Sequence, residues 1–276
     1  MLVHRDRLVE AGALVNGSRA GASVAGPSAG GLLVAILTAP FAVLADAASF
    51  IASAWWLRRV AVPRPAPDAD PGRLADGVRF IARSPLVRPI LAATATLNVF
   101  TFAISALFVL YATRSLGISP ATLRIVLGAG AIGGVLGSVV TRRIVERIGV
   151  GAAFAAGCIL FTAPLLLIPL ASGPPAAVLG LHFLAQFGAG FGVMVLDISA
   201  GAILVAAVPD TLRARMFGAY QLVNYSVRPI GALGGGALGA AIGLQPTLWI
   251  AGIGAVASVL WLLPSPVPQM RALPET

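Results

Sequence analysis

Long apolar stretches fill most of this chain and alternate with short polar or charged breaks. Most stretches are close to the roughly 20 residues that an α-helix needs to cross the hydrocarbon core of a bilayer, and the sixth and seventh are longer. We predict about eight transmembrane helices, and the sequence therefore indicates an all-α, polytopic membrane protein. The predicted spans are 21–37, 41–60, 89–112, 123–144, 151–170, 176–207, 217–242 and 246–263.

The composition agrees with a lipid environment. Of the 276 residues, 58% are hydrophobic and only 11% are charged, whereas soluble domains carry about 25% charged residues. The formal charge of +9 raises the question of a nucleic-acid partner. Because the basic residues lie mainly between the apolar stretches and do not cluster beside a soluble fold, we expect a lipid bilayer and no nucleic acid as the partner.

The arginines predict an orientation. If the spans alternate, almost all arginines outside the spans fall on one side of the membrane, and only Arg114 and Arg124 are left for the other side. The side richer in arginine is cytoplasmic by the positive-inside rule. With an even number of spans, both termini are then cytoplasmic.

A Pro-rich and Arg-rich connection divides the predicted spans into two and six. We predict a remnant of one transporter half at 1–62, a cytoplasmic linker at 63–88, a six-helix bundle at 89–264 and a cytoplasmic tail at 265–276. Within the linker, Leu74, Val78 and Ile81 share one face of a possible amphipathic helix on the inner membrane surface. A solvated linker is the alternative.

The two ends of the chain show a weak internal similarity. Gly26, Gly30 and Gly31 align with Gly231, Gly235 and Gly236. With a shift of one residue, Pro40 and Trp55 align with Pro246 and Trp261. Two parallel halves of a transporter would give this repeat, although matched glycines also arise by chance in a Gly-rich chain. The repeat predicts that about four helices are missing before Met1.

Three stretches resemble the major facilitator superfamily, and specifically its bacterial branch that includes the enterobactin exporter. They are LVHRDRLVEAGALVNGSRAGASVAGPSAGG, VLADAASFIASAWWL and VPDTLRARMFGAY. The resemblance implies a partial major facilitator fold, helices five to twelve, truncated at the N-terminus. It also implies a multi-pass protein of the bacterial cytoplasmic membrane that exports a small hydrophobic compound or siderophore in exchange for protons. A non-transporting fragment, or a membrane partner of another carrier, is the alternative.

The first motif behind this resemblance is a glycine-rich segment in the first predicted span. Gly26, Pro27, Gly30 and Gly31 resemble the antiporter motif of superfamily exporters, which implies a packing hinge in a proton-coupled carrier. Ordinary close packing of helices through glycine is the alternative. Pairs of glycines four apart recur elsewhere, and such faces also allow self-association. These pairs are Gly130/Gly134, Gly188/Gly192 and Gly235/Gly239.

Two further motifs lie in predicted cytoplasmic loops. One resembles the family's loop between helices eight and nine, with Thr141 where an Asp often stands, and the other resembles the loop between helices ten and eleven, with Ala214 in place of Gly. Positive-inside charge alone is the alternative explanation for their arginines. The motif residues are Gly137, Arg142, Arg143, Arg147 and Gly149 in the first loop, and Asp210, Arg213 and Arg215 in the second.

Ionisable and amide side chains inside predicted spans are candidates for transport and proton coupling, because burying them in lipid is costly. Asp46 is a candidate proton acceptor or else a helix-start residue near the interface. Asp197 and Arg228 are expected at similar depth on antiparallel neighbouring helices. They would pair there, or Asp197 would exchange its proton for substrate while Arg228 tunes it, unless Arg228 extends to the inner interface. His182 is a candidate proton relay or a buried polar residue. Asn98 is a candidate for a polar path or an interhelical hydrogen bond.

No pattern in the sequence predicts an enzyme, a cofactor or a metal site. Glycine-rich strings such as GAGAIGG follow no predicted strand, as a dinucleotide loop would require. The single cysteine, Cys158, cannot form an intrachain disulfide or a zinc site. The expected partners are therefore a small-molecule substrate, protons and lipid.

Overall fold

The computed structural model describes residues 44, 47–56, 58–59 and 74–272. The chain divides into two compact units, Met1–Pro71 and Gly72–Thr276, and each is described by itself. Several predictions lie outside the described residues. They concern the span 21–37, the motif residues Gly26, Pro27, Gly30 and Gly31, and Asp46.

The first unit contains a helix over 47–56, inside the predicted span 41–60. At its end the rings of Trp55 and Trp56 meet edge to face, with 5.7 Å between their centroids. The Arg59 guanidinium lies 3.7 Å from the centroid of the Trp55 ring. Exposed indole rings beside a cation are typical of a helix end at a membrane–water interface.

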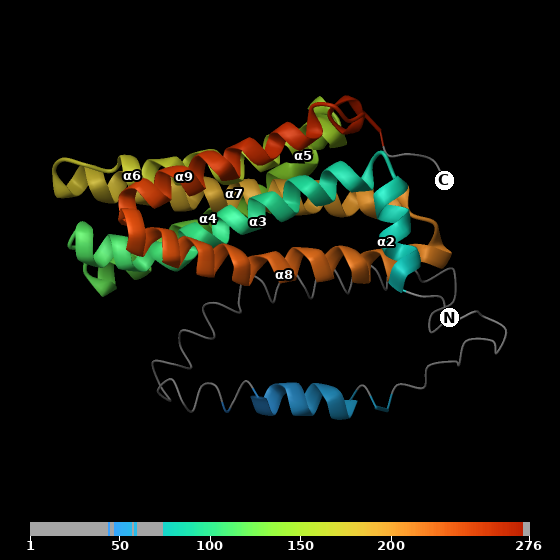
Figure 1. The fold of residues 1–276 in the computed structure, drawn as a ribbon, viewed down its shortest axis with the longest axis horizontal. Helices are drawn as coiled ribbons and strands as arrows, with labels where there is room; N and C mark the ends of the chain where they lie inside the picture. Colours follow the sequence, from blue (N-terminus) through green and yellow to red (C-terminus); the bar gives the residue numbers. More distant parts are fainter. Residues whose placement is uncertain (1–43, 45–46, 57, 60–73, 273–276) are drawn as a thin grey trace. The chain divides into compact units, whose positions relative to one another are not determined.

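In the second unit, long helices run back and forth along one axis (Figure 1). Short π and 3₁₀ segments, labelled η, extend or join them. The helices are α2 Leu74–Arg83, α3 Val87–Leu110, α4 Pro120–Ile148, α5 Val150–Thr162, α6 Leu167–Leu170, α7 Pro175–Ala207, α8 Asp210–Ile242 and α9 Leu244–Ala257. The η segments are the π-helix η2 Tyr111–Ser115 and the 3₁₀ helices η3 Ala163–Leu166, η4 Ser258–Leu262 and η5 Val267–Gln269.

These helices cover each of the six predicted spans from 89–112 onward. Five segments are long and apolar enough to cross a membrane: Val87–Ser115, Pro120–Ile148, Val150–Leu170, Pro175–Ala207 and Leu244–Leu262. The helix α8 has the length but is less apolar, because it carries Gln221, Asn224, Arg228 and several glycines. The all-α, polytopic membrane architecture is thus confirmed.

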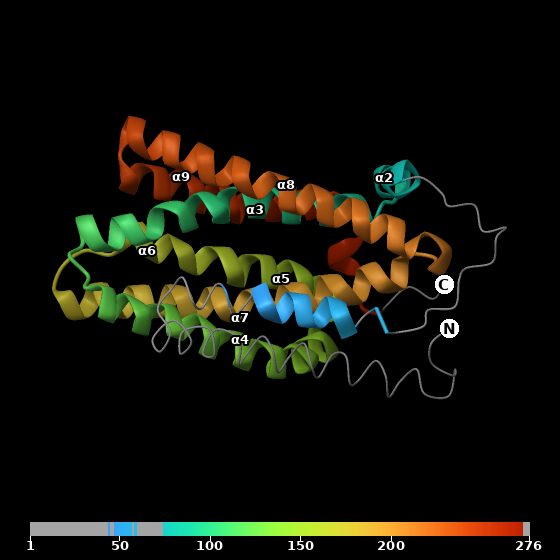
Figure 2. The same cartoon turned by 90° about the horizontal axis from the view of Figure 1, so that it is seen from below.

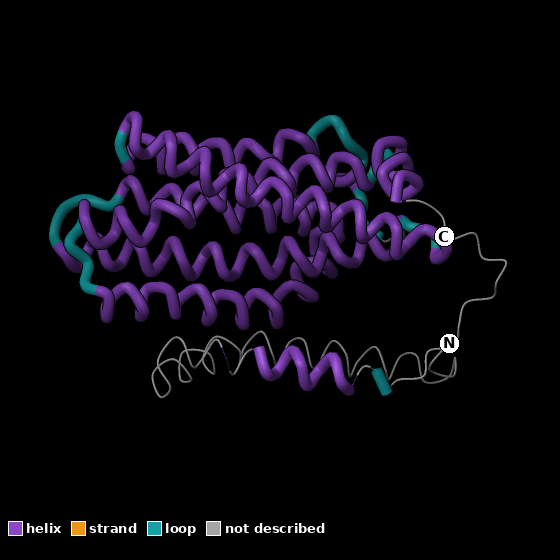
Figure 3. Tube along the Cα trace, turned by 60° about the horizontal axis from the view of Figure 1, so that its bottom comes forward, coloured by secondary structure: helices purple, strands orange, loops and turns teal. Residues whose placement is uncertain are grey.

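The bundle is made of two groups of three helices, which Figure 2 shows one above the other. One group consists of α3, α8 and α9, and the other of α4, α5 and α7. Successive helices run in opposite directions, so their turns gather at two ends, as the tube in Figure 3 shows. We call the end with α2 and the start of α8 the arginine end. The end with the α3–α4 and α6–α7 turns is the pocket end.

Glycine lets helices approach closely inside each group. A Cβ on Gly133 or Gly137 of α4 would meet backbone atoms of Phe187 or Phe191 on α7. On α8, a Cβ on Gly231 or Gly235 would meet backbone atoms on α3. All six glycines of the three pairs singled out above as possible self-association faces lie against other helices of the same chain. They are Gly130, Gly134, Gly188, Gly192, Gly235 and Gly239.

The turns between helices follow ordinary capping chemistry. Ser119 caps α4, because its hydroxyl accepts a hydrogen bond from the Thr122 backbone N–H at 3.2 Å, and Pro120 occupies the first helical position. Gly149 separates α4 from α5 with φ of 88°, a left-handed conformation that favours glycine. The space beside Gly149 is taken by Met270 and Arg271.

Large apolar side chains occur both inside and outside the bundle. The outer face of α4 exposes Ile125, Ile132 and Val139, seven residues apart, as a helix surface in contact with lipid would. Inside, one buried apolar cluster lies toward the arginine end around Phe154 and Met216. A second lies toward the pocket end around Phe108 and Ile168.

The helix α2 forms within the predicted linker, where an amphipathic helix on the inner membrane surface was expected. Ile81 is buried, whereas Val78 is 51% exposed. Gly77 instead faces the bundle, against backbone atoms of Arg215 and Met216 at the start of α8. The helix thus docks on α8 through its glycine, a residue that apolar periodicity does not count, and contact of its apolar face with the membrane surface stays a prediction.

Candidate functional site

Two layers of hydrogen-bonded side chains join α3 to α8. The hydroxyls of Thr94 and Tyr220 lie 2.9 Å apart. One turn further, the Asn98 amide Nδ2 donates to the Asn224 Oδ1, also at 2.9 Å. Both pairs are separated by 126 residues in sequence, as expected of two parallel helices in constant register. Asn98 is therefore engaged in an interhelical hydrogen bond, the alternative raised for it from the sequence.

Arg228 lies one turn beyond Asn224, and completes a line of polar residues spaced by four along α8. Its guanidinium is 4.2 Å from the centroid of the Tyr225 ring and 4.9 Å from that of Phe102 on α3. Both distances are within the range of cation–π attraction. Within the described part of the chain, the buried Nε of Arg228 has no hydrogen-bond partner. Arg228 is thus held by aromatic faces and leaves N–H groups for other contacts.

Asp197 lies on α7, in the other group of helices, with an exposed side chain. Arg228 is close enough to Asp197 to act on the carboxyl electrostatically, and Asp197 acts in turn on Tyr220. Among the described residues no ion pair joins Asp197 directly to Arg228. The two are electrostatic neighbours, and the contact pair expected from the sequence is not formed.

Helix boundaries explain this difference. Asp197 lies ten residues before the end of α7, and Tyr220 lies ten residues after the start of α8. Arg228 is eighteen residues after that start, about 12 Å further along the helix axis at 1.5 Å per residue. The sequence placed the start of this span at 217, whereas α8 begins at Asp210. That error moved Arg228 to the apparent depth of Asp197.

His182 is completely buried near the pocket end of α7. Its Nδ1 lies 2.8 Å from the Val178 carbonyl oxygen one turn earlier on the same helix, and its ring lies 5.9 Å from that of Phe108 on α3. Within the described residues, its Nε2 has no hydrogen-bond partner. The structure therefore places His182 away from Asp197, in an apolar contact between α7 and α3.

The motif at the end of α4 is split between the helix interior and the surface. Gly137 packs against α7, and Thr141 is buried and donates to the Gly137 carbonyl at 2.6 Å. Arg142 is exposed and pairs with Glu146 on its own helix at 2.8 Å. Arg143 and Arg147 are also exposed. Thr141, which stands where an acid was expected, thus makes only a local hydrogen bond.

The second loop motif joins three elements at the arginine end. Arg213 donates to the carbonyl oxygens of Val205 and Val208 at 3.1 and 3.3 Å, near the end of α7. A cation there completes carbonyl groups that the helix leaves without partners. Arg215 lies 3.8 Å from the Asp76 carboxylate on α2. Asp210 is the first residue of α8.

Sequence reasoning did not single out Thr94 and Tyr220. Each lies four residues before an asparagine on the same helix, Asn98 or Asn224, and this repeated spacing could have found them. Among the described residues, His, Cys, Asp and Glu form no group of three or more that could hold a metal ion.

Comparison with known proteins gives one match. A family model described as "Transmembrane secretion effector" matches residues 1–275. No curated protein and no solved structure matches the chain. The family match covers nearly the whole sequence and includes both units.

Proposed function

Because this chain belongs to the transmembrane secretion effector family of the major facilitator superfamily, we propose that it is a secondary active carrier driven by protons. In this proposal it exports a small hydrophobic compound or siderophore. The observation that carries the proposal is the carboxyl of Asp197, ten residues before the end of α7, with Arg228 of α8 as its electrostatic neighbour.

A carboxyl far from either end of a membrane-spanning helix suggests a role in proton exchange. Among the described residues, Asp197 is the carboxyl furthest from a helix end. Charged groups inside transmembrane segments are costly, so an intramembrane acid with a nearby cation is a candidate for proton exchange. The hydrogen-bonded layers of α3 and α8 give the same region a fixed polar framework.

In the proposed cycle, Asp197 alternates between a neutral and a charged form. Proton binding removes the negative charge, and proton loss restores a carboxylate that the field of Arg228 stabilises. The two forms differ by one charge on a helix face bordered by apolar residues such as Ile198. Substrate binding that favours one form over the other would couple its export to proton entry.

We place the arginine end in the cytoplasm, following the positive-inside rule. The exposed Arg142, Arg143 and Arg147 and the α2 residues Arg79 and Arg83 are at this end. The proposed location is the bacterial cytoplasmic membrane. Asp197 is nearer to the arginine end of α7, so its proton would be released toward the cytoplasm.

The test is proton-driven transport of a fluorescent dye by everted membrane vesicles that contain this chain alone. We expect dye uptake into the vesicles when their interior is acidified, and loss of that uptake in Asp197→Asn. The control is Glu146→Gln, which changes an exposed carboxylate that pairs only on the surface of α4. Glu146→Gln should transport like the wild type.

Two outcomes would contradict the proposal. Uptake by Asp197→Asn that still follows the pH gradient would remove Asp197 from proton coupling. Absence of uptake by a correctly inserted wild-type chain would contradict transport by this polypeptide alone and favour a non-transporting membrane partner.

A further inference from the structure

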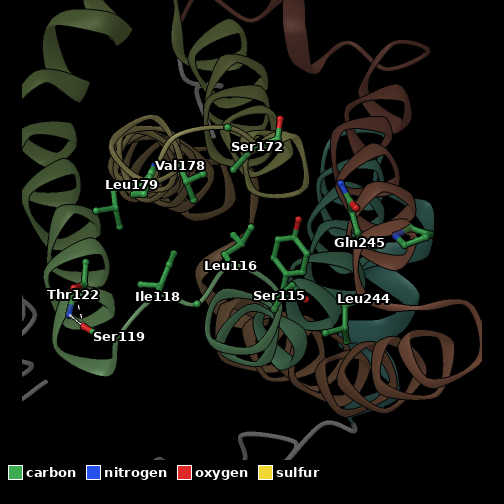
Figure 4. A pocket seen from close by; sticks show the side chains of 16 residues that line it. Ser115, Leu116, Ile118, Ser119, Thr122, Ser172, Val178, Leu179, Leu244 and Gln245 are labelled. Carbon is green, nitrogen blue, oxygen red and sulfur yellow. Dashed lines mark hydrogen bonds between the residues drawn. The ribbon is translucent and has the colours of Figure 1, made fainter.

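A pocket of about 910 Å³ lies at the pocket end of the bundle, far along the helices from Asp197 (Figure 4). Its walls come from four parts of the chain: the end of α3 with η2, the turn into α4, the α6–α7 turn with the start of α7, and the start of α9. Pockets of roughly 300–1,000 Å³ are the usual size for small-molecule ligands. The pocket is therefore large enough for a complete small molecule.

The chemistry of the lining points to an uncharged ligand. None of the sixteen lining residues is Asp, Glu, Arg, Lys or His. A charged ligand would lose its hydration there without meeting an opposite charge, and this is costly. In Figure 4, the apolar side chains of Leu116, Ile118 and Val178 lie between Ser119 and Thr122 on one side and Ser172 and Gln245 on the other.

Some polar groups of the pocket lining are hydrogen-bonded within the protein, and others are not. The hydroxyls of Ser119 and Thr122 bond to each other at 2.9 Å, and the Gln245 Nε2 donates to the Pro169 carbonyl at 2.9 Å. In the part of the chain that the structure describes, the hydroxyls of Tyr111, Ser115 and Ser172 make no hydrogen bond. These hydroxyls can donate to or accept from a ligand, so a ligand with acceptor oxygens can bond to them.

The backbone around the pocket provides a separate argument. Tyr111 and Ser115 are the first and last residues of the π-helix η2, which directly follows α3 and ends it. A π-helical turn is rare in proteins compared with an α-helical one. The irregular turn of this helix coincides with the wall of the pocket.

We propose that this pocket binds a neutral, amphiphilic small molecule that has hydrogen-bond-accepting oxygens and an apolar body. The apolar body packs against Leu116, Ile118 and Val178, and the acceptor oxygens bond to the hydroxyls of Tyr111 and Ser115. A role of this pocket in export rests on the proposed function. Binding itself does not require transport.

Protection of an introduced cysteine tests the binding directly. In a Cys158→Ala background, Ser172→Cys places a thiol in the pocket wall, and Ala176→Cys places one on the exposed first turn of α7 outside the lining. The rate of modification by N-ethylmaleimide is measured in purified protein with ethyl cinnamate, a neutral ester, and with cinnamate, its anionic parent. Both variants must first elute and melt like the background protein.

We expect ethyl cinnamate to slow modification of Ser172→Cys several-fold, and cinnamate to leave it unchanged. Ala176→Cys should react equally fast with either compound. Adding Tyr111→Phe should raise the half-protecting ester concentration about fivefold, since one hydrogen bond is lost. Protection should persist in Asp197→Asn, so a failure of proton coupling would not resemble a failure of binding.

Three results would overturn the pocket assignment. They are no protection by the ester at saturation, equal protection by the anion, and equal protection of Ala176→Cys.

Discussion

The two long helix contacts of the bundle, α4 with α7 and α3 with α8, are built by different means. In the first, Gly130, Gly133 and Gly137 bring α4 against the backbone of α7. The second also has glycine against backbone, at Gly231 and Gly235, but adds the hydrogen-bonded layers of Asn98–Asn224 and Thr94–Tyr220. In lipid, close packing alone suffices to join helices, so the added polar layers call for another explanation.

The added polar layers are explained by where they lie in the bundle. The polar layers lie on the helix that also carries Arg228, and Tyr220 is an electrostatic neighbour of Asp197. The α3–α8 contact therefore fixes the register of the residues proposed for proton coupling, while the α4–α7 contact provides a rigid support for Asp197. Breaking each contact should have effects of different size and kind.

The largest effect should come from the glycine contact. A side chain at Gly133 would overlap the Phe187 carbonyl oxygen on α7, so Gly133→Leu should destabilise the folded protein by about 3 kcal/mol or prevent its recovery. The measurement is the thermal unfolding midpoint in detergent. Gly128→Leu on the same helix is the control, because the space beside Gly128 is open. Equal unfolding midpoints for the two variants would contradict the close contact.

An intermediate effect is expected from the hydrogen-bonded contact. Asn98→Leu leaves the Asn224 Oδ1 without its donor in a buried place and should cost about 2 kcal/mol. The double variant Asn98→Leu/Asn224→Leu should cost less than the sum of the two single variants, because neither amide is then left unpaired. Additive costs in a double-mutant cycle of unfolding free energies would mean that the pair is not coupled.

How far the sequence predicted these contacts depends on the kind of signal. Apolar length located the helices, so each predicted span from 89–112 onward has its counterpart. Boundaries failed where a helix extends beyond its apolar part: α8 starts at Asp210, seven residues before the predicted span. Partners across helices were beyond reach, because the pairing of Thr94 with Tyr220 depends on the relative rotation of two helices. The pocket depends on turns that come together only in three dimensions.

The smallest effect should come from a polar residue that lacks the pairing seen between Asn98 and Asn224. His182 is buried against Phe108, and only its Nδ1 has a hydrogen-bond partner within the described residues. Burial of Nε2 therefore carries a desolvation cost that no hydrogen bond offsets. His182→Leu, which is close in volume, should raise the unfolding free energy by about 1 kcal/mol.

Dye transport by the same His182→Leu variant separates the two interpretations of this residue. If His182 is only a buried polar side chain, the variant should be more stable and transport at the wild-type rate. Loss of proton-driven uptake in a well-folded His182→Leu protein would instead assign the histidine to the proton path. The polar groups that matter for coupling would then extend along α7 from Asp197 toward the pocket end, beyond the paired layers of α3 and α8.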